Sequence, residues 1–264
     1  IILDYLFIGF FHLGASGAAL GTTLSQACSV LFALIAIKRK QTGLSLSGDC
    51  FRPQKKTLGK ILNIGIPVAL QDGFIQIAFI VITIIANRRG LNAAAAVGIV
   101  EKIISFPSSM LSTVSALAAQ NIGAGKYDRA KQTLRYAMMI AIGFGLVVSI
   151  LIQFIAAPVV GLFTADAAVI LLGAQYIRGY IWDCIFAGVH FSFSGYFCAC
   201  GKSGISFLHN LIAILCVRIP GVYLTSKIFP HTLFPMGLAT ATGSLLSVII
   251  CIIAYRWLCE KSGK

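Results

Sequence analysis

Residues 133–156 read TLRYAMMIAIGFGLVVSILIQFIA, and after Arg135 this run contains no charged side chain. A transmembrane α-helix needs about 20 consecutive, mostly apolar residues to cross the hydrocarbon core of a bilayer. The run meets this requirement. The sequence therefore predicts that these residues form a membrane-spanning helix.

Similar apolar segments lie on both sides of this run. At the amino end, an apolar stretch continues only to about Leu13, which is too short to cross a bilayer. The complete predicted spans are residues 17–37, 61–85, 93–119, 133–156, 167–200, 206–228 and 236–258. We therefore predict an all-α fold, a polytopic membrane helix bundle.

The composition of the 264-residue chain agrees with this fold class. Hydrophobic residues make up 58% of the chain, charged residues only 11%, and the mean hydropathy is +0.91. In an ordinary soluble domain about a quarter of the residues are charged, and disordered chains are poor in apolar residues. The composition thus excludes both of these classes.

Basic residues are concentrated in alternate loops. Residues 38–60 contain seven Lys and Arg and residues 86–92 contain two, whereas 120–135 contain four and 157–166 contain none. Because cytoplasmic loops carry an excess of Lys and Arg, the loop of 38–60 and the C-terminus are predicted to be cytoplasmic. Binding of nucleic acid would need one contiguous basic soluble face. The net charge of +13 therefore reflects topology, and we expect no nucleic-acid partner.

The chain begins Ile1-Ile2-Leu3-Asp4, already inside an apolar stretch and without Met. Removal of a signal peptide would leave a polar mature terminus. We therefore expect this start to be a transmembrane helix cut through its middle, with further sequence upstream.

Polar side chains recur along one face of the predicted 167–200 helix. They follow the i, i+4, i+7, i+11, i+14, i+18 spacing that aligns side chains on a helix, at Tyr176, Tyr180, Asp183, Ala187, His190 and Ser194. Such a face lines either a water-filled cavity or a helix interface. Asp183 with the two tyrosines is a candidate cation or proton site, with a structural hydrogen bond as the alternative. His190 either relays protons or is a structural histidine.

Two further helices have polar faces. In 61–85, Asp72 and Gln76 are one turn apart and follow Pro67, which makes Asp72 a candidate coupling residue. In 93–119, Glu101 and Ser105 begin a line of hydroxyl-bearing positions. Glu101 is a candidate for the cavity lining, or else it pairs with Lys102 or a neighbouring helix. Arg218, beside Pro220, is predicted to be a structural partner for a carboxylate or for carbonyls.

Motifs of enzymes are absent from the sequence. There is no GxSxG elbow, no HExxH and no Cys/His spacing of a metal cluster, and Gly201-Lys202-Ser203 lacks the glycine spacing of a P-loop. We therefore expect no enzymatic activity, no catalytic residues, no bound metal cofactor and no other cofactor.

Several stretches together have a distinctive pattern. They are ILDYLFI at 2–8, GASGAALGTTLSQ at 14–26, GIPVALQ at 65–71, AQNIGAG at 119–125 and GYFCACGK at 195–202. In this order they resemble the fifth-to-sixth helix region, the start of the seventh helix, the loop after the eighth and the end of the tenth helix of MATE (multidrug and toxic compound extrusion) transporters. The resemblance covers essentially the whole chain, and its most specific part is the Gln120–Gly125 segment.

The resemblance implies a domain organisation. MATE transporters have two pseudo-symmetric lobes of six helices, and this chain resembles the part from the end of helix 5 to helix 12. Residues 1–37 would then be the end of the N-terminal lobe, 38–60 a cytoplasmic inter-lobe loop, 61–258 the six-helix C-terminal lobe and 259–264 a cytoplasmic tail. The rest of the N-terminal lobe would be the missing partner.

The resemblance also implies a function. The family exports cationic or amphipathic compounds across the cell (plasma) membrane in exchange for Na⁺ or H⁺ by alternating access. Asp183 with Tyr176 and Tyr180 resembles an arrangement on the tenth helix of the family, and Asp72 lies on the seventh, where some branches carry a coupling carboxylate. Gln76, Glu101, Ser105 and His190 would line the substrate cavity. Two alternatives remain: a flippase for lipid-linked precursors, and a non-transporting helical remnant or assembly partner whose polar faces are buried against each other.

Overall fold

The computed structural model describes residues 2–39, 54–104 and 109–262. Every regular element in these ranges is a helix, so the prediction of an all-α membrane bundle is confirmed. The chain divides into two compact units, Ile1–Lys55 and Lys56–Lys264. Most of the predicted 38–60 loop lies outside the described residues, although α3 already begins at Lys55.

The first unit contains a short helix α1 (Ile2–Asp4), a π-helical turn η1 (Tyr5–Phe10) and the long helix α2 (Gly14–Arg39). The chain reverses between η1 and α2, where His12 and Gly14 have φ angles of 52° and 54°. Glycine adopts such positive φ angles without steric cost. Helix α2 covers the predicted span 17–37 and is long and apolar enough to cross a membrane.

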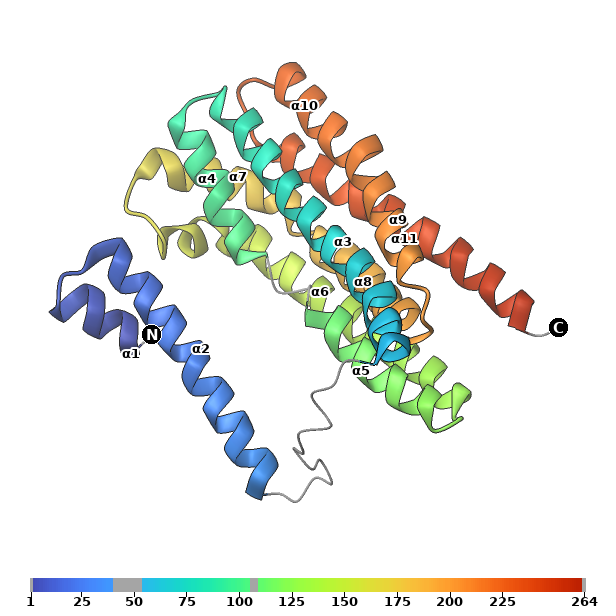
Figure 1. The fold of residues 1–264 in the computed structure, drawn as a ribbon. Helices are drawn as coiled ribbons and strands as arrows, with labels where there is room; N and C mark the ends of the chain where they lie inside the picture. The colour runs from blue at the N-terminus through green and yellow to red at the C-terminus, as the bar shows by residue number, and fades with distance from the viewer. Residues whose placement is uncertain (1, 40–53, 105–108, 263–264) are drawn as a thin grey trace. The chain divides into compact units, whose positions relative to one another are not determined.

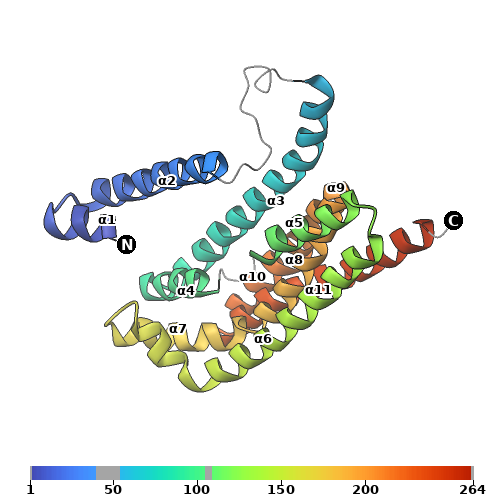
Figure 2. The same cartoon turned by 90° about the horizontal axis from the view of Figure 1, so that it is seen from below.

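The second unit contains the remaining helices. In chain order they are α3 (Lys55–Asn87), α4 (Leu91–Ile103), α5 (Ser109–Gly123), α6 (Tyr127–Gly161), α7 (Ala167–Tyr180), α8 (Asp183–Ala199), α9 (Ser203–Ala213), the π-helical turn η4 (Ile214–Arg218), α10 (Ile219–Ile228) and α11 (Phe234–Ser262). Figures 1 and 2 show α4 and α7 at one end of this unit and α5 at the other, with α6 and α11 running between the two ends.

Four segments of this unit, as described, are long and apolar enough to cross a membrane: α3, α6, the stretch Ser203–Ile228 and α11. Helix α6 continues past the predicted 133–156 span and bends at Ile155, whose φ and ψ are −109° and 18°. Pro158 follows three residues later and cannot donate a backbone hydrogen bond, which is an ordinary cause of a kink.

Two predicted spans are each divided into two helices, so the prediction of continuous helices over 93–119 and 167–200 is wrong. In the first, α4 ends at Ile103 and α5 begins at Ser109. The sequence between them contains Pro107, but it lies outside the described residues. In the second, α7 ends at Tyr180 and α8 begins at Asp183. No proline or glycine lies between these two residues, and side chains of α6 bond to carbonyls at the break.

The core of the second unit consists of two apolar clusters. The larger one surrounds Tyr176 and Ile177 of α7, and the smaller one surrounds Phe193 and Phe197 of α8. Between them, buried polar side chains gather around the α7–α8 break and the helices that pack against it. They include Ser149, Asp183, His190, Ser194, His209, Arg218, Ser244 and Ser247. Buried polar side chains therefore extend from the break along α8 inside the bundle.

Helices α7 and α11 approach closely at two glycines. A Cβ atom on Gly179 would meet the carbonyl oxygen of Phe234 and lie 2.9 Å from the nitrogen of Leu238. A Cβ on Gly237 would meet the carbonyl oxygen of Tyr176 and lie 2.7 Å from the nitrogen of Tyr180. Because these are backbone atoms, only glycine fits at either position. Small residues commonly allow such close helix packing in membranes.

The turn between α3 and α4 is tied to the loop between α10 and α11 by one side chain. Arg89 Nη1 donates to the carbonyl oxygen of Thr232 at 3.1 Å, and Nη2 donates to those of Phe229 at 3.0 Å and of Pro230. These bonds satisfy carbonyls at and beyond the end of α10 that have no helical donor. Arg89 thereby fixes two connections at one end of the bundle.

Candidate functional site

The break between α7 and α8 presents Asp183 in the middle of the bundle. At the break the backbone follows a tighter turn, in which the nitrogens of Cys184 and Ile185 donate to the carbonyls of Ile181 and Trp182 at 3.0 and 3.2 Å. These are bonds between residues three apart rather than the four of an α-helix. Asp183 is the first residue of α8 and is 4% exposed.

Two polar side chains of α6 stabilise this break. Ser149 Oγ donates to the carbonyl oxygen of Ile181 at 3.2 Å, and Gln153 Nε2 donates to that of Arg178 at 3.1 Å. An interrupted helix within a membrane must have its carbonyls satisfied by neighbouring side chains. Ser149 and Gln153 are one helical turn apart on α6, so they reach successive parts of the break.

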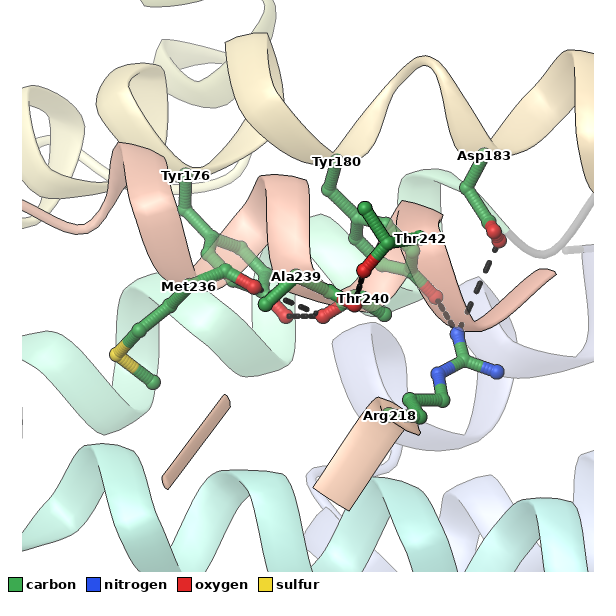
Figure 3. Close-up of polar contacts among 8 residues, drawn as sticks. All are labelled: Tyr176, Tyr180, Asp183, Arg218, Met236, Ala239, Thr240 and Thr242. Atoms are coloured by element: carbon green, nitrogen blue, oxygen red, sulfur yellow. Dashed lines mark hydrogen bonds and ion pairs between the residues drawn. The ribbon is translucent and has the colours of Figure 1, made fainter. Parts of the chain in front are cut away.

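Asp183 faces a buried arginine from another helix (Figure 3). Arg218 Nη2 lies 3.8 Å from Asp183 Oδ2 and donates a hydrogen bond of 2.7 Å to the hydroxyl of Tyr180. The guanidinium carbon also lies 5.2 Å from the ring centre of Phe79 and 5.7 Å from that of Tyr180. The prediction that Arg218 is a structural partner for a carboxylate is confirmed.

Arg218 is positioned by the π-helical turn η4. The nitrogen of Ile219 donates to the carbonyl of Ile214, five residues earlier, and Pro220 next in the chain has no N–H to donate. On its other side the arginine packs against Gly243 of α11, where a Cβ would lie 2.9 Å from the Cβ of Arg218. The proline and the glycine together place Arg218 at the level of Asp183.

A cavity of about 540 Å³ opens beside this pair. Its described lining comes from α3, α5, α7, α8, η4 and neighbouring helices and combines acidic, basic, hydroxyl and aromatic groups. The lining residues are Asp72, Ile75, Gln76, Phe79, Ile104, Ser109, Leu111, Ser112, Tyr180, Asp183, Ala187, His190, Phe191, Asn210, Arg218 and Ser244. A volume of this size is in the range of small-molecule sites.

Three polar atoms of residues that line this cavity have no hydrogen-bond partner among the described residues. They are Asp183 Oδ1, Arg218 Nε and His190 Nδ1. These residues are 4%, 8% and 3% exposed, respectively. Buried polar atoms in a folded protein are nearly always paired. Three buried polar atoms beside the cavity are therefore unsatisfied, and a polar or charged ligand could pair with them only if these side chains turned toward it.

The structure brings together most of the predicted site residues. Tyr180, Asp183, Asp72, Gln76 and His190 all line the cavity.

Three predicted site residues do not contribute to the described lining. Tyr176 lies in the larger apolar cluster, where its hydroxyl is 3.5 Å from Thr240 Oγ1 (Figure 3). Glu101 is half-buried and is not among the described lining residues, although its Oε1 atom is buried and has no partner among them. Ser105 lies outside the described residues. Sharing a predicted polar face with a cavity residue therefore does not by itself place a side chain in the cavity.

Sequence reasoning missed a buried histidine network beside the cavity. His209 Nε2 lies 2.8 Å from Ser194 Oγ, and its Nδ1 lies 3.2 Å from Ser247 Oγ. The ring of His190 is 5.6 Å from that of His209. The polar stripe on α8 indicated His190 and Ser194, but no sequence spacing relates them to His209 of α9 and Ser247 of α11.

The described residues contain no group of three or more His, Cys, Asp or Glu side chains arranged to hold a metal ion. A monovalent cation at this site would have to rely on one carboxylate together with hydroxyl and amide oxygens. The described lining contains the carboxylates of Asp72 and Asp183, with hydroxyl and amide groups such as those of Ser244 and Gln76.

Comparison with known proteins places these features in a family. The family model MatE matches residues 67–224, more than half of the chain. Among curated relatives, the multidrug export protein MepA of Staphylococcus aureus strain N315 is 29% identical over 262 residues, covering 97% of this chain and 57% of MepA. MepA of Staphylococcus haemolyticus is 29% identical over 237 residues, covering 88% of this chain and 52% of that protein. The chain thus spans little more than half the length of these relatives.

Solved structures share the fold. A MOP superfamily transporter from Pyrococcus furiosus has a TM-score of 0.88 at 20% identity, with 100% of this chain and 60% of that chain covered. A mutant form of the Vibrio cholerae MATE transporter VcmN has a TM-score of 0.86 at 18% identity, with coverages of 98% and 59%. Since the family model matches more than half of the sequence and the fold agrees, this multi-pass membrane chain belongs to the MATE family of multidrug transporters.

Proposed function

We propose that the protein containing this chain is a secondary antiporter that exports cationic or amphipathic compounds in exchange for Na⁺ or H⁺. The proposal is supported by membership of the MATE family and by similarity to proteins named multidrug export protein MepA. The chain covers 57% of MepA, so the rest of the transport path would come from an N-terminal lobe. The helical segments from α3 to α11 would form the C-terminal lobe.

The observation that carries the proposal is the composition of the cavity. Two carboxylates, Asp72 and Asp183, share it with the aromatic side chains of Phe79, Tyr180 and Phe191. An organic cation is bound best where a carboxylate offsets its charge and aromatic rings contact its apolar part. The cavity supplies both kinds of contact within about 540 Å³.

Coupling would follow if the exported compound and the coupling ion compete for the same carboxylate. An ionisable group within a membrane protein is costly unless it has a partner, and such residues commonly mark ion pathways. In this proposal the organic cation alternates with H⁺ at Asp183 and with Na⁺ or H⁺ at Asp72. His190, which lines the same cavity, would contact the substrate rather than the coupling ion.

Alternating access would use the interruptions in the helices at the level of the cavity. These are the α4–α5 and α7–α8 breaks and the π-helical turn η4. Discontinuous helices near the substrate site are typical of secondary transporters. The proposed setting is the plasma membrane with a cytoplasmic C-terminus, as the excess of Lys and Arg in alternate loops indicates.

The two alternatives have less support from the described residues. A flippase for lipid-linked precursors would need basic side chains for phosphate groups, but the described lining contains one basic residue, Arg218, and two acidic ones, Asp72 and Asp183. A non-transporting remnant would have its polar faces buried against each other. Instead, Asp72 and Asp183 share a cavity, and Asp72 is exposed.

The test is uptake of a fluorescent organic cation into everted membrane vesicles that contain the protein expressed from its complete coding sequence. Na⁺ and pH gradients are imposed separately, and wild type is compared with Asp183→Asn and Asp72→Asn. Asp166→Asn is the matched control, because Asp166 caps α7 outside the cavity and Asn is an equally good cap. We expect gradient-driven transport in wild type and in the control, and at least a tenfold loss in Asp183→Asn. Transport by Asp183→Asn at the wild-type rate would contradict the assigned role.

A further inference from the structure

Arg218 occupies the position that a bound cation would take at Asp183. Its Nη2 atom is 3.8 Å from Asp183 Oδ2, and its guanidinium carbon lies within 6 Å of the ring centres of Phe79 and Tyr180. A carboxylate and aromatic rings are the groups expected to bind an organic cation. The side chain of Arg218 therefore uses the same contacts as the proposed substrate.

Arg218 and Asp183 form an ion pair without a direct hydrogen bond between Nη2 and Oδ2. Charge-assisted N–H···O⁻ bonds are about 2.7–2.9 Å long, whereas the Arg218–Asp183 separation is 3.8 Å. Asp183 Oδ1 and Arg218 Nε have no partner among the described residues. The short bond of Arg218 is instead the one to the Tyr180 hydroxyl, at 2.7 Å. Asp183 Oδ1 therefore keeps unused acceptor capacity, while Arg218 is held mainly by Tyr180.

The two kinds of cation differ in what they gain at this site. A Na⁺ ion at Asp183 would be repelled by the guanidinium and gain little from the rings of Phe79 and Tyr180, because it is small and strongly hydrated. An organic cation can take over these ring contacts and bury apolar surface as well. The geometry therefore favours displacement of Arg218 by an organic cation over displacement by Na⁺.

The backbone around Arg218 gives it a way to move. The residue ends the π-helical turn η4 immediately before α10. A π-helical turn holds one extra residue within a helix and is frequently found at functional sites. A shift between π and α geometry would rotate Arg218 about the helix axis without breaking the span.

We propose that Arg218 is a tethered counter-ion for Asp183 that determines cation selectivity: it closes the Asp183 end of the cavity to Na⁺ and yields to organic cations. This rests on the proposed function, because it identifies which cations the site admits. Arg218 acts here through Asp183 and is a positioning and specificity residue.

Binding to the purified full-length protein tests this proposal. Affinity for a fluorescent organic cation is measured by fluorescence anisotropy, and the ²²Na⁺ stoichiometry by scintillation proximity, at constant ionic strength. The variants are Arg218→Met, which keeps the volume and removes the charge, and the double variant with Asp183→Asn. Tyr180→Phe keeps both charges and removes the hydroxyl that holds Arg218. Tyr196→Phe is the control, since its ring packs against Tyr255 in the smaller apolar cluster.

We expect Arg218→Met to bind the organic cation about tenfold more tightly and to bind one additional Na⁺ per protein. Asp183→Asn in the same chain should abolish both gains. Tyr180→Phe should tighten organic-cation binding by a smaller factor, and Tyr196→Phe should match wild type. If Arg218→Met does not fold, Tyr180→Phe decides the question alone.

Unchanged or weaker organic-cation binding in folded Arg218→Met and Tyr180→Phe would overturn the proposal. If wild type exports the organic cation under a gradient while these variants bind as wild type does, the assignment of Arg218 fails and the proposed function stands. If wild type neither binds nor exports the organic cation, the proposed function itself fails.

Discussion

Replacing Gly237 by alanine tests the close packing of α7 against α11, on which the position of the site depends. The added Cβ would meet the carbonyl oxygen of Tyr176 and lie 2.7 Å from the nitrogen of Tyr180. Because backbone atoms cannot move aside as a flexible side chain can, α7 and α11 would have to separate. Separation would also stretch the contact between Tyr176 and Thr240.

The expected magnitude follows from two opposing effects. Overpacking costs up to about 3 kcal/mol, and the greater helix propensity of alanine offsets about 1 kcal/mol of this. The net loss of about 2 kcal/mol corresponds to a decrease of about 4–8 °C in Tm for a chain of this size. Gly143→Ala on α6 is the matched control, since no atom lies within 4 Å of its added Cβ. In the Gly143→Ala control only the greater helix propensity of alanine changes the stability, so we expect Tm to rise by about 2–4 °C.

The assay is thermal unfolding of the purified protein in detergent, followed by intrinsic fluorescence. The two alanine variants should shift Tm in opposite directions. If Gly237→Ala unfolds at the same temperature as Gly143→Ala or above it, α7 and α11 do not make the backbone contact described here.

Two further substitutions test polar contacts between helices and loops by the same measurement. Arg89→Ala removes the bonds between the α3–α4 turn and the α10–α11 loop and should cost about 2–3 kcal/mol, whereas its exposed neighbour Arg88→Ala should change Tm little; equal effects would count against the clamp. Ser194→Ala leaves a nitrogen of buried His209 unpaired and should cost about 1–3 kcal/mol. Ser192→Ala, whose hydroxyl bonds only within its own helix, should cost less, and the opposite order would contradict the histidine network.

Length and hydropathy predicted most of the spans, because an apolar run long enough to cross a bilayer forms a helix there. The continuous helices predicted over 93–119 and 167–200 were the exceptions. Proline accompanies two of the interruptions: Pro158 follows the bend in α6, and Pro220 follows η4. The break at Ile181 and Trp182 could not be predicted in the same way. It depends on Ser149 and Gln153, which are far from it in the sequence and reach it only in the folded bundle.

The candidate site was predictable only in part for a related reason. The helical spacing predicted that Tyr176, Tyr180, Asp183 and Ser194 share a face. It could not predict which residues of other helices each side chain would contact. In the structure, Tyr176 lies in the apolar core, and Tyr180 and Asp183 line the cavity. Ser194 contacts His209 in the histidine network. Each outcome depends on a residue of another helix, and no spacing along one helix contains that information.

Binding of the exported cation in the cavity beside Asp183 can be tested by cysteine labelling. Ala187→Cys places a thiol in the cavity lining of a full-length protein whose native cysteines have been replaced. Ala96→Cys, at a fully buried core position, is the control. We predict that a cationic methanethiosulfonate labels position 187 but not position 96, and that an exported organic cation slows this labelling. A position 187 that does not react, or that reacts at the same rate with and without the organic cation, would show that the exported cation does not bind there.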